Sequence, residues 1–296
     1  GTWCPPVNVV GAYFPKENKM AKQDLVYRGK SKDVFKITGG KHKGKYRLVF
    51  TDRATGFMEN GKPVFDPGRD EVVGEIPGKG AIACRFATHF FKLLQSKGIA
   101  THYIETISDN EMIVEPALPL FLKEAAPQLA GAAPLQNLEF TWRNNATGSF
   151  WRRYPFVRPC GNLNRLVEIW TKGDSDILIT KEALGETGAL TGKEISDSVK
   201  LVKKIAKIVS AEFTARGLHV IDGKFELGRL KYGDGKIVLI DEISPDVLRV
   251  CRGYKPDQEG HCMIYRQCVE TAFAGGKRTI RNKKQVAAAD FIDIFL

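Results

Sequence analysis

The alternation of polar and apolar residues is clearest in the second half of the chain, where it predicts a β-hairpin. Two runs of β-type residues, 224–230 and 236–240, flank the Gly- and Asp-rich segment 232–235, whose composition is typical of a hairpin turn. Side chains on a strand point alternately to its two faces. One face of the first strand therefore carries Asp222, Lys224 and Glu226, and the other carries Gly223, Phe225 and Leu227.

The second strand of this hairpin is apolar until it ends at Asp241 and Glu242. A hairpin of this length places Glu226 beside Asp241, and Lys224 is available to neutralise a phosphate. Two carboxylates from neighbouring strands suit Mg²⁺, which usually keeps one or two protein carboxylates together with phosphate and water oxygens. The alternative is a solvent-facing side of a half-buried strand, which is common in antiparallel sheets. The acidic end of the second strand favours the metal site.

Two segments have helical periodicity. Residues 80–98 place apolar side chains on one face, and Gly98 ends this helix. Thr191 and Glu194 form a capping box that opens a longer helix, which ends before Gly217. Further β-type runs are predicted at 25–35 (interrupted at 29–32), 47–50, 101–107, 111–114, 138–143 and 166–172.

A change of composition divides the chain. Residues 125–134 are rich in Ala and Pro, and this shift marks the predicted boundary between two lobes. We therefore expect an N-terminal extension at residues 1–24, a β-rich lobe at 25–134 and an α/β lobe at 135–296. Residues 56–80 are rich in Gly, Pro and charge, which predicts a long connection that is either functional or mobile.

The interruption of the first strand reads Gly29-Lys30-Ser31-Lys32. Glycine lets backbone N–H groups approach a ligand closely, and two lysines with a hydroxyl between them suit a polyphosphate. The spacing is not that of a Walker loop, which is longer between its glycines and opens a helix. By composition alone, an ordinary exposed turn is the favoured interpretation of this segment.

A second candidate phosphate site follows the predicted strand at 138–143. Arg143 and Ser149 flank an Asn-, Thr- and Gly-containing loop, and Arg152 and Arg153 follow shortly after it. Arginine is the better fork-shaped partner for a phosphate. A solvated basic loop is the alternative.

Charge narrows the class of partner. The net charge is +11, from 45 Lys and Arg residues against 34 Asp and Glu residues, so anionic partners are favoured. The basic residues are spread over the chain, without a Lys- and Arg-rich run interleaved with aromatics. We therefore expect small anions rather than nucleic acid.

The six cysteines are scattered, with no CxxC pair, which predicts free thiols in a reducing compartment. No run of about 18 apolar residues suits a membrane span, and the N-terminus does not have the pattern of a secretory signal. We expect a cytoplasmic protein with no membrane partner.

Six short motifs follow one another along the chain: YRGKSK (27–32), TDR (51–53), IPGKG (76–80), RNNATGS (143–149), IDGKFELG (221–228) and DEISPDVLR (241–249). Together, and in this order, they resemble the SAICAR synthetase (phosphoribosylaminoimidazole-succinocarboxamide synthase) family of purine biosynthesis. The resemblance spans roughly residues 25–270. The joint match is specific, although each motif alone is weak.

The resemblance implies an α+β fold with two lobes, similar to ATP-grasp enzymes, in which the nucleotide lies between the lobes. It implies an ATP- and Mg²⁺-dependent ligase that joins L-aspartate to carboxyaminoimidazole ribotide. The N-terminal lobe would bind ATP, and the C-terminal lobe would carry the metal and ribotide sites. The sequence leaves the oligomeric state open, so a homo-oligomer is allowed.

The resemblance also assigns residues to functions. The ATP phosphates would be bound by Gly29, Lys30, Ser31, Lys32 and Lys172. Mg²⁺ would be held by Glu226 and Asp241. The ribotide would be bound by Arg143, Ser149, Arg249 and Arg266. Catalytic positions would be occupied by Lys224, which can also contact the ribotide, and by Asp222 and Asp52.

The chain departs from the family pattern after Arg249, where residues 250–254 replace a segment of Trp-Asp-Lys or Leu-Asp-Lys type. Because of this departure, the family pattern aligns less well in the segment that assigns a function to Arg266. Residues 58–75 also form a longer segment than in many relatives.

Two rival functions stay open: a small-molecule kinase or other ligase on the same fold, and an RNA-binding scaffold supported by the positive charge.

Overall fold

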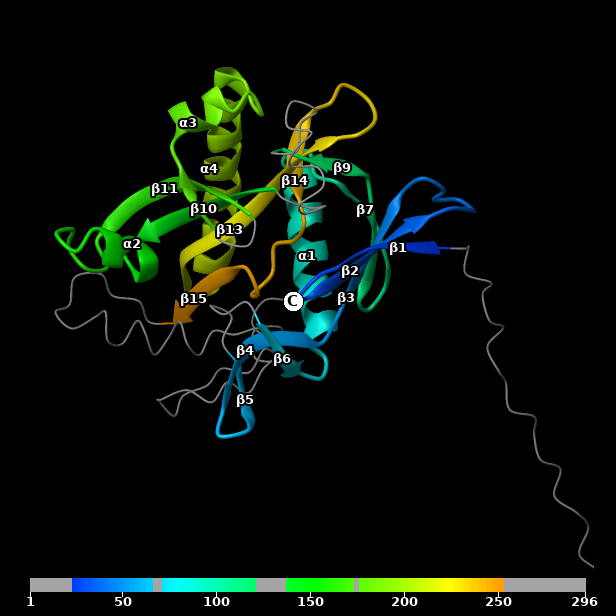
Figure 1. Cartoon of the computed structure of the whole chain (residues 1–296), viewed down its shortest axis with the longest axis horizontal. Helices are drawn as coiled ribbons and strands as arrows, with labels where there is room; N and C mark the ends of the chain where they lie inside the picture. The colour runs from blue at the N-terminus through cyan, green and yellow to red at the C-terminus, as the bar shows by residue number, and fades with distance from the viewer. Residues whose placement is uncertain (1–22, 66–70, 121–136, 173–175, 253–296) are drawn as a thin grey trace, which may run out of the picture.

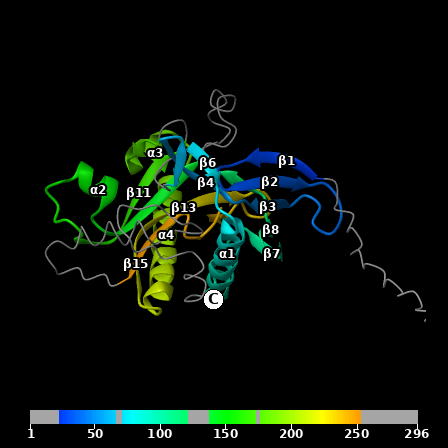
Figure 2. The same cartoon turned by 90° about the horizontal axis from the view of Figure 1, so that it is seen from below.

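The described part of the chain contains three antiparallel sheets and two long helices (Figure 1). The structure is a computed structural model, and it describes residues 23–65, 71–120, 137–172 and 176–252. Seen from below, helices α1 (Lys79–Ser96) and α4 (Gly192–Thr214) lie next to each other on one side of the sheets (Figure 2). They touch through Phe90 and Phe213, whose rings stack with centroids 5.8 Å apart. Strands and helices are therefore mixed as an α+β fold requires.

The first sheet has five strands in the order β1-β2-β3-β8-β7. Their bounds are Gln23–Arg28 (β1), Lys32–Ile37 (β2), Tyr46–Phe50 (β3), Tyr103–Ser108 (β7) and Glu111–Val114 (β8). Helix α1 buries Phe86, Phe90 and Leu94 in the core that it shares with this sheet. The predicted interruption of the first strand is confirmed, since β1 and β2 pair across the turn at residues 29–31.

A small second sheet corrects one expectation. Residues 56–80 do not form a long connection, because β4 (Arg53–Glu59), β5 (Lys62–Phe65) and β6 (Glu71–Glu75) pair in the order β5-β4-β6. Gly56 explains why composition misled: a Cβ atom there would lie 2.0 Å from the Val64 carbonyl oxygen. In this segment a glycine permits close strand pairing rather than a loop.

The third sheet is built around β13 (Leu218–Leu230), which pairs with β10 on one side and with β14 and β15 on the other. Its other strands are β9 (Ala117–Pro119), β10 (Leu138–Asn145), β11 (Asn162–Thr171), β12 (Leu178–Ile179), β14 (Ile237–Ile240) and β15 (Leu248–Arg252). Two short helices, α2 (Gly148–Arg153) and α3 (Lys181–Glu186), lie between these strands in the sequence. Helix α4 packs on the apolar face of the sheet.

The predicted start of α4 is confirmed. Thr191 Oγ1 accepts the backbone N–H of Glu194 at 3.2 Å, and Glu194 Oε2 accepts the backbone N–H of Thr191 at 2.8 Å. These two bonds satisfy donors that the first turn of a helix leaves unpaired. The helix begins where its sequence signal lies.

Three other expectations concern the chain as a whole. The predicted lobe boundary at 125–134 lies outside the described residues, so the division into lobes at that point stays a prediction. In the described part of the chain, no helix combines the length and apolar character needed to cross a membrane. Cys84 is a buried free thiol, as expected, whereas Cys160 is disulfide-bonded, which corrects the prediction of a free thiol there.

Candidate active site

One face of the third sheet carries a row of charged side chains. Alternation along β13 sends Phe225 and Leu227 into the core and leaves the intervening side chains on the other face. The same alternation holds on β10, where Phe140 and Trp142 are buried in the core. Opposed pairs across the two strands are Glu139–Glu226, Thr141–Lys224 and Arg143–Asp222. The hairpin prediction is confirmed, and a neighbouring strand extends its charged face.

Two carboxylates meet at one end of this row. Glu226 lies opposite Ile240, so Asp241 follows directly after the paired residue. Lys172, after β11, pairs with the Glu226 carboxylate and is 3.7 Å from Glu139 Oε1. Glu226 Oε2 also accepts the Asn137 side-chain amide at 3.2 Å. The carboxylate is therefore held in place by a cation and an amide.

The electrostatics of the two carboxylates differ. Burial, together with the nearby Asp241 charge, raises the pKa of Glu226 above its ordinary value. Burial acts to raise the pKa of Asp241 as well, but Lys32 and Lys172 outweigh it and lower this pKa to about 2. Asp241 is thus ionised at neutral pH. An additional cation beside Glu226 would stabilise the ionised form of its carboxylate.

The donor set fits a hard divalent cation. Glu226 and Asp241 converge from paired strands, and within the described ranges no group of three or more His, Cys, Asp or Glu side chains forms a closed metal site. A cation here would complete its coordination with ligand and water oxygens, as Mg²⁺ commonly does. Asp241 has a left-handed backbone with φ of 68°, an unusual conformation that Asp tolerates better than most residues.

The Gly-Lys-Ser-Lys turn joins the first sheet to this cluster. The Gly29 N–H donates to the Lys32 carbonyl at 2.7 Å, and a Cβ at Gly29 would lie 2.9 Å from that oxygen, which favours glycine. Lys30 is exposed at the tip of the turn. Lys32 is buried, and its Nζ lies 2.9 Å from Asp241 Oδ1 and also pairs with Glu242. The two lysines therefore occupy different environments.

Asp222 holds two arginines at the other end of the row. Arg143 Nη1 donates to Asp222 Oδ2 at 2.7 Å, and Arg249 Nε donates to Asp222 Oδ1 at 2.5 Å. Arg143 Nη2 also donates to Ser149 Oγ at 2.9 Å. Arg249, more than 100 positions away in the sequence, is thus brought together with Arg143 on one carboxylate, and Ser149 is bonded to Arg143. This confirms that they are neighbours, and their roles stay a prediction.

Two acidic residues of this face were missed by sequence reasoning. Glu139 accepts Lys224 Nζ at 2.7 Å, and Glu168 accepts Arg143 Nε at 3.1 Å while also pairing with Arg153. The sequence could have indicated Glu139, because Glu139 and Arg143 alternate with apolar residues along one strand and therefore share a face. The strand partner that carries Glu168 could not be identified from local pattern.

Asp52 makes its described contacts outside this row. Asp52 accepts the backbone N–H groups of Gly78 and Gly80 at 3.0 and 2.9 Å, which anchors the start of α1. These bonds give Asp52 a structural function in addition to its predicted catalytic one. Arg266 lies outside the described residues.

The model of the SAICAR synthetase family matches residues 25–263. The chain belongs to the SAICAR synthetase family. A phosphoribosylaminoimidazole-succinocarboxamide synthase of Clostridium tetani is 38% identical over 230 residues, covering 76% of this chain and 91% of the relative. A relative of the same name from Pyrobaculum calidifontis is 31% identical over 244 residues, covering 81% and 87%. The resemblance of the six motifs is confirmed.

Solved structures of SAICAR synthetases share the fold. One from Ehrlichia chaffeensis aligns with a TM-score of 0.63 at 23% identity, covering 88% of this chain and all of the other. A SAICAR synthetase in complex with ADP aligns with a TM-score of 0.61 at 26% identity, covering 86% and 99%. The predicted α+β SAICAR synthetase fold is therefore confirmed.

Proposed function

We propose that this member of the SAICAR synthetase family is an ATP-dependent ligase. It joins the amine of L-aspartate to the carboxylate of carboxyaminoimidazole ribotide and forms ADP and phosphate, in the cytoplasm. The observation that carries the proposal is the charged row on β10 and β13. Its metal-type carboxylates lie at one end, and its arginine pair lies at the other. A ligase needs both ends close together, because the phosphoryl donor and the acceptor carboxylate must meet.

The nucleotide end comprises Lys32, Lys172, Glu226 and Asp241. Burial acts to lower the pKa of Lys32 and Lys172, but the surrounding carboxylates outweigh it and both pKa values lie above the ordinary value. Both side chains therefore stay cationic and can neutralise phosphate oxygens. Mg²⁺ held by Glu226 and Asp241 would add charge neutralisation for the transferred phosphoryl group. A SAICAR synthetase of the same fold has been solved in complex with ADP, which supports the proposal that this chain binds a nucleotide.

The turn supplies further nucleotide contacts. Lys30 is exposed at its tip, where it can reach a phosphate, and Gly29 keeps the backbone of the turn compact. Ser31 accepts, through its carbonyl, the backbone N–H of Thr51 at 2.8 Å, which fastens the turn to the end of β3. We assign Lys30 to phosphate binding and Gly29 and Ser31 to the shape of the turn.

The ribotide end comprises Arg143, Ser149 and Arg249, with Arg266 assigned by family position. Arg249 keeps 35% of its side chain exposed, whereas Arg143 exposes 5% and donates to Glu168, Asp222 and Ser149. Arg249 can therefore grip a substrate anion directly. Arg143 contributes charge and fixes the Ser149 hydroxyl and the Asp222 carboxylate.

The chemistry follows from these charges. A carboxylate is a poor electrophile, so ATP first transfers its γ-phosphoryl group to a carboxylate oxygen of the ribotide. The aspartate amine then attacks the acyl carbon, phosphate leaves with that oxygen, and the amine proton passes to water. Burial acts to lower the pKa of Lys224, but the Glu139 charge outweighs it and raises this pKa. Lys224 therefore acts as a cation beside anionic groups, and positioning carries most of the catalysis.

ADP release tests the proposal. ADP formation should require both carboxyaminoimidazole ribotide and L-aspartate, and omission of aspartate should reduce it to a small background. ADP release of equal rate without aspartate would instead indicate a kinase. Tight RNA binding that weakens steeply with salt, without ADP formation, would indicate the RNA-binding scaffold.

A further inference from the structure

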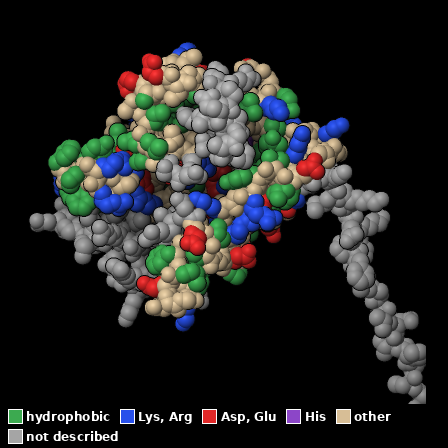
Figure 3. All heavy atoms as spheres, viewed as in Figure 1, with side chains coloured by type: hydrophobic (Ala, Val, Ile, Leu, Met, Phe, Trp, Pro, Cys, Tyr) green, Lys and Arg blue, Asp and Glu red, His purple; other side chains and the backbone are tan. Residues whose placement is uncertain are grey.

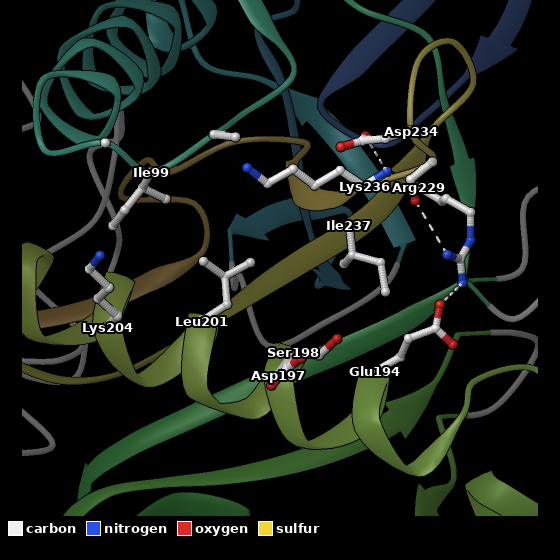
Figure 4. Close-up of a pocket in the computed structure, with 13 residues that line it drawn as sticks. Ile99, Glu194, Asp197, Ser198, Leu201, Lys204, Arg229, Asp234, Lys236 and Ile237 are labelled. Atoms are coloured by element: carbon white, nitrogen blue, oxygen red, sulfur yellow. Dashed lines mark hydrogen bonds and ion pairs between the residues drawn. The ribbon is translucent and has the colours of Figure 1, made fainter.

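A pocket of about 480 Å³ lies on the helix-covered side of the third sheet. Three segments form it: the turn after α1, the first half of α4, and the β13–β14 hairpin (Figure 4). Arg229 lines the pocket, and strand alternation places it on the opposite face of β13 from Glu226. Its volume is in the range of small-molecule sites, roughly 300–1,000 Å³. The pocket is therefore separate from the proposed active site.

A buried hydroxyl in the wall of this pocket has no partner. Ser198 is 2% exposed, and its Oγ makes no hydrogen bond within the part of the chain that the structure describes. Buried polar groups in proteins are usually paired, because an unpaired one loses its bond to water without replacement. A ligand with a hydrogen-bonding group can supply the missing partner.

The acidic side chains around the pocket are already paired. Glu194 Oε1 lies 2.7 Å from Arg229 Nη2, and Asp197 Oδ2 lies 2.5 Å from Lys193 Nζ. Asp234 Oδ1 accepts the backbone N–H of Lys236 at 3.0 Å. Glu194 and Asp197 are therefore neutralised by cations, whereas Asp234 is held by a backbone amide.

Two cations remain for a ligand. Over the described ranges, the ammonium groups of Lys204 and Lys236 have no carboxylate within ion-pair distance, and both residues line the pocket. In Figure 4, Glu194 and Arg229 lie at one side of the pocket, while the ends of Lys204 and Lys236 extend to the other. Lysine binds phosphate as a point charge, and two ammonium groups together can neutralise a phosphate dianion.

We propose that this pocket binds a small phosphate monoester with an aromatic or apolar body. Lys204 and Lys236 hold the phosphate, and Ile99, Leu201 and Ile237 contact the body between them. A polar group on that body pairs with the Ser198 hydroxyl. The phosphate, the apolar body and the polar group of the ligand thus each contact a matching part of the pocket.

Methyl NMR of the full chain tests binding, with the δ1 methyl groups of Ile99 and Ile237 as local reporters. The probes are 4-hydroxyphenyl phosphate, phenyl phosphate and inorganic phosphate at millimolar concentration. We expect 4-hydroxyphenyl phosphate to shift both methyl signals saturably. Lys204→Ala and Lys236→Ala should each raise its Kd by about tenfold or more, and both together should abolish the shifts. Lys207→Ala, exposed on the same helix but outside the pocket, is the control and should leave Kd unchanged.

Ser198→Ala tests the hydroxyl. In the parent chain 4-hydroxyphenyl phosphate should bind more tightly than phenyl phosphate, and the variant should lose this preference. Its Tm should be equal or higher, because an unpaired buried hydroxyl is removed. The proposal is overturned by unshifted methyl signals, by shifts that survive in the double lysine variant, or by inorganic phosphate binding as tightly as 4-hydroxyphenyl phosphate.

Discussion

Lys32 Nζ, from the turn of the first sheet, lies 2.9 Å from Asp241 Oδ1, at the end of β14 in the third sheet. This ion pair joins two segments 209 positions apart in the chain. Lys32 is buried, whereas Asp241 keeps 28% of its side chain exposed. Lys32 also pairs with a second carboxylate, the buried Glu242, which accepts a hydrogen bond from Ser244. The link makes the nucleotide end of the site a junction between the two sheets.

Lys32→Ala and Lys30→Ala should therefore differ. Removing Lys32 leaves the buried Glu242 and the half-buried Asp241 without this cation, and losing one partner of a buried pair typically costs about 3–5 kcal/mol. We expect a lower free energy of unfolding together with slower turnover. Lys30→Ala should raise the ATP KM with an unchanged Tm, because Lys30 is exposed. Denaturant unfolding and ATP kinetics of both variants decide this, and equal behaviour would contradict the division of roles.

Glu226→Gln and Asp241→Asn should each lower kcat on the order of a hundredfold or more, since each removes one charge from the metal-type pair. Asn tolerates the left-handed backbone of Asp241, so the fold should be kept. Steady-state rates at saturating Mg²⁺ and circular dichroism provide the measurement. Glu186→Gln, exposed on α3, is the matched control. Activity within twofold of the parent in either test variant would exclude that residue as a metal ligand.

Arg249→Lys should raise the ribotide KM by about tenfold or more and leave the ATP KM unchanged, because lysine keeps the charge but loses the fork. A contact equal in ground and transition states leaves kcat nearly constant. Arg143→Lys should also raise the ribotide KM, with some loss of stability, because Arg143 makes two buried contacts and one part-buried contact. Arg152→Lys, exposed on α2, is the control. A rise in the ATP KM with an unchanged ribotide KM would show that the nucleotide end and the ribotide end of the site are assigned wrongly.

Acid should weaken the fold through Asp241. Its pKa of about 2 lies below the ordinary value of 3.8, so its ionised form stabilises the folded state. This contribution is fully present above about pH 4 and is lost as the pH falls toward 2. Asp241→Asn has no such group, so its Tm should fall less than that of the parent over this window. Parallel Tm curves for the two proteins would contradict the shifted pKa.

Thr191→Ala should lower the free energy of unfolding by about 1 kcal/mol, because it removes the side-chain acceptor at the start of α4. Thr191→Ser keeps the hydroxyl and serves as the control. Urea unfolding of both variants gives the difference. Equal loss in both would mean that the hydroxyl does not carry the effect.

Features with a local cause could be predicted from the sequence. The capping box and the β13–β14 hairpin depend on residues close together in the chain, and both lie where their patterns indicate. The charged face of β13 follows from strand alternation, which needs no knowledge of the partner strand. The family motifs, in turn, identified which charges to expect at the site.

Features that depend on distant pairing could not be predicted. The contacts of Glu168 with Arg143 and Arg153 require β11 to pair with β10 in one particular register. The loop predicted between Arg143 and Ser149 leads into a short helix, α2, which begins at Gly148 and was not predicted. Gly56 was misread because the same glycine signal marks both turns and close strand contacts.

Surface charge agrees with the anionic reactants of the proposed ligase. In Figure 3 Lys and Arg side chains gather around α2, where Arg152 and Arg158 are exposed. A positive field near a binding site speeds the arrival of anions, and salt weakens this effect. Anionic substrates therefore suffice to account for the positive surface charge, and a nucleic-acid partner is not needed.

The central position of β13 determines which parts of the site can fluctuate. This strand of thirteen residues pairs with β10 and β9 on one side and with β14 and β15 on the other. Such a strand opens only when the surrounding sheet is disrupted, so its amide protons should exchange with solvent most slowly. Local opening events that leave this sheet intact would then keep the charged row on β13 in its native arrangement. Motions that admit substrate and release product must come from its surroundings, such as the turn that carries Lys30.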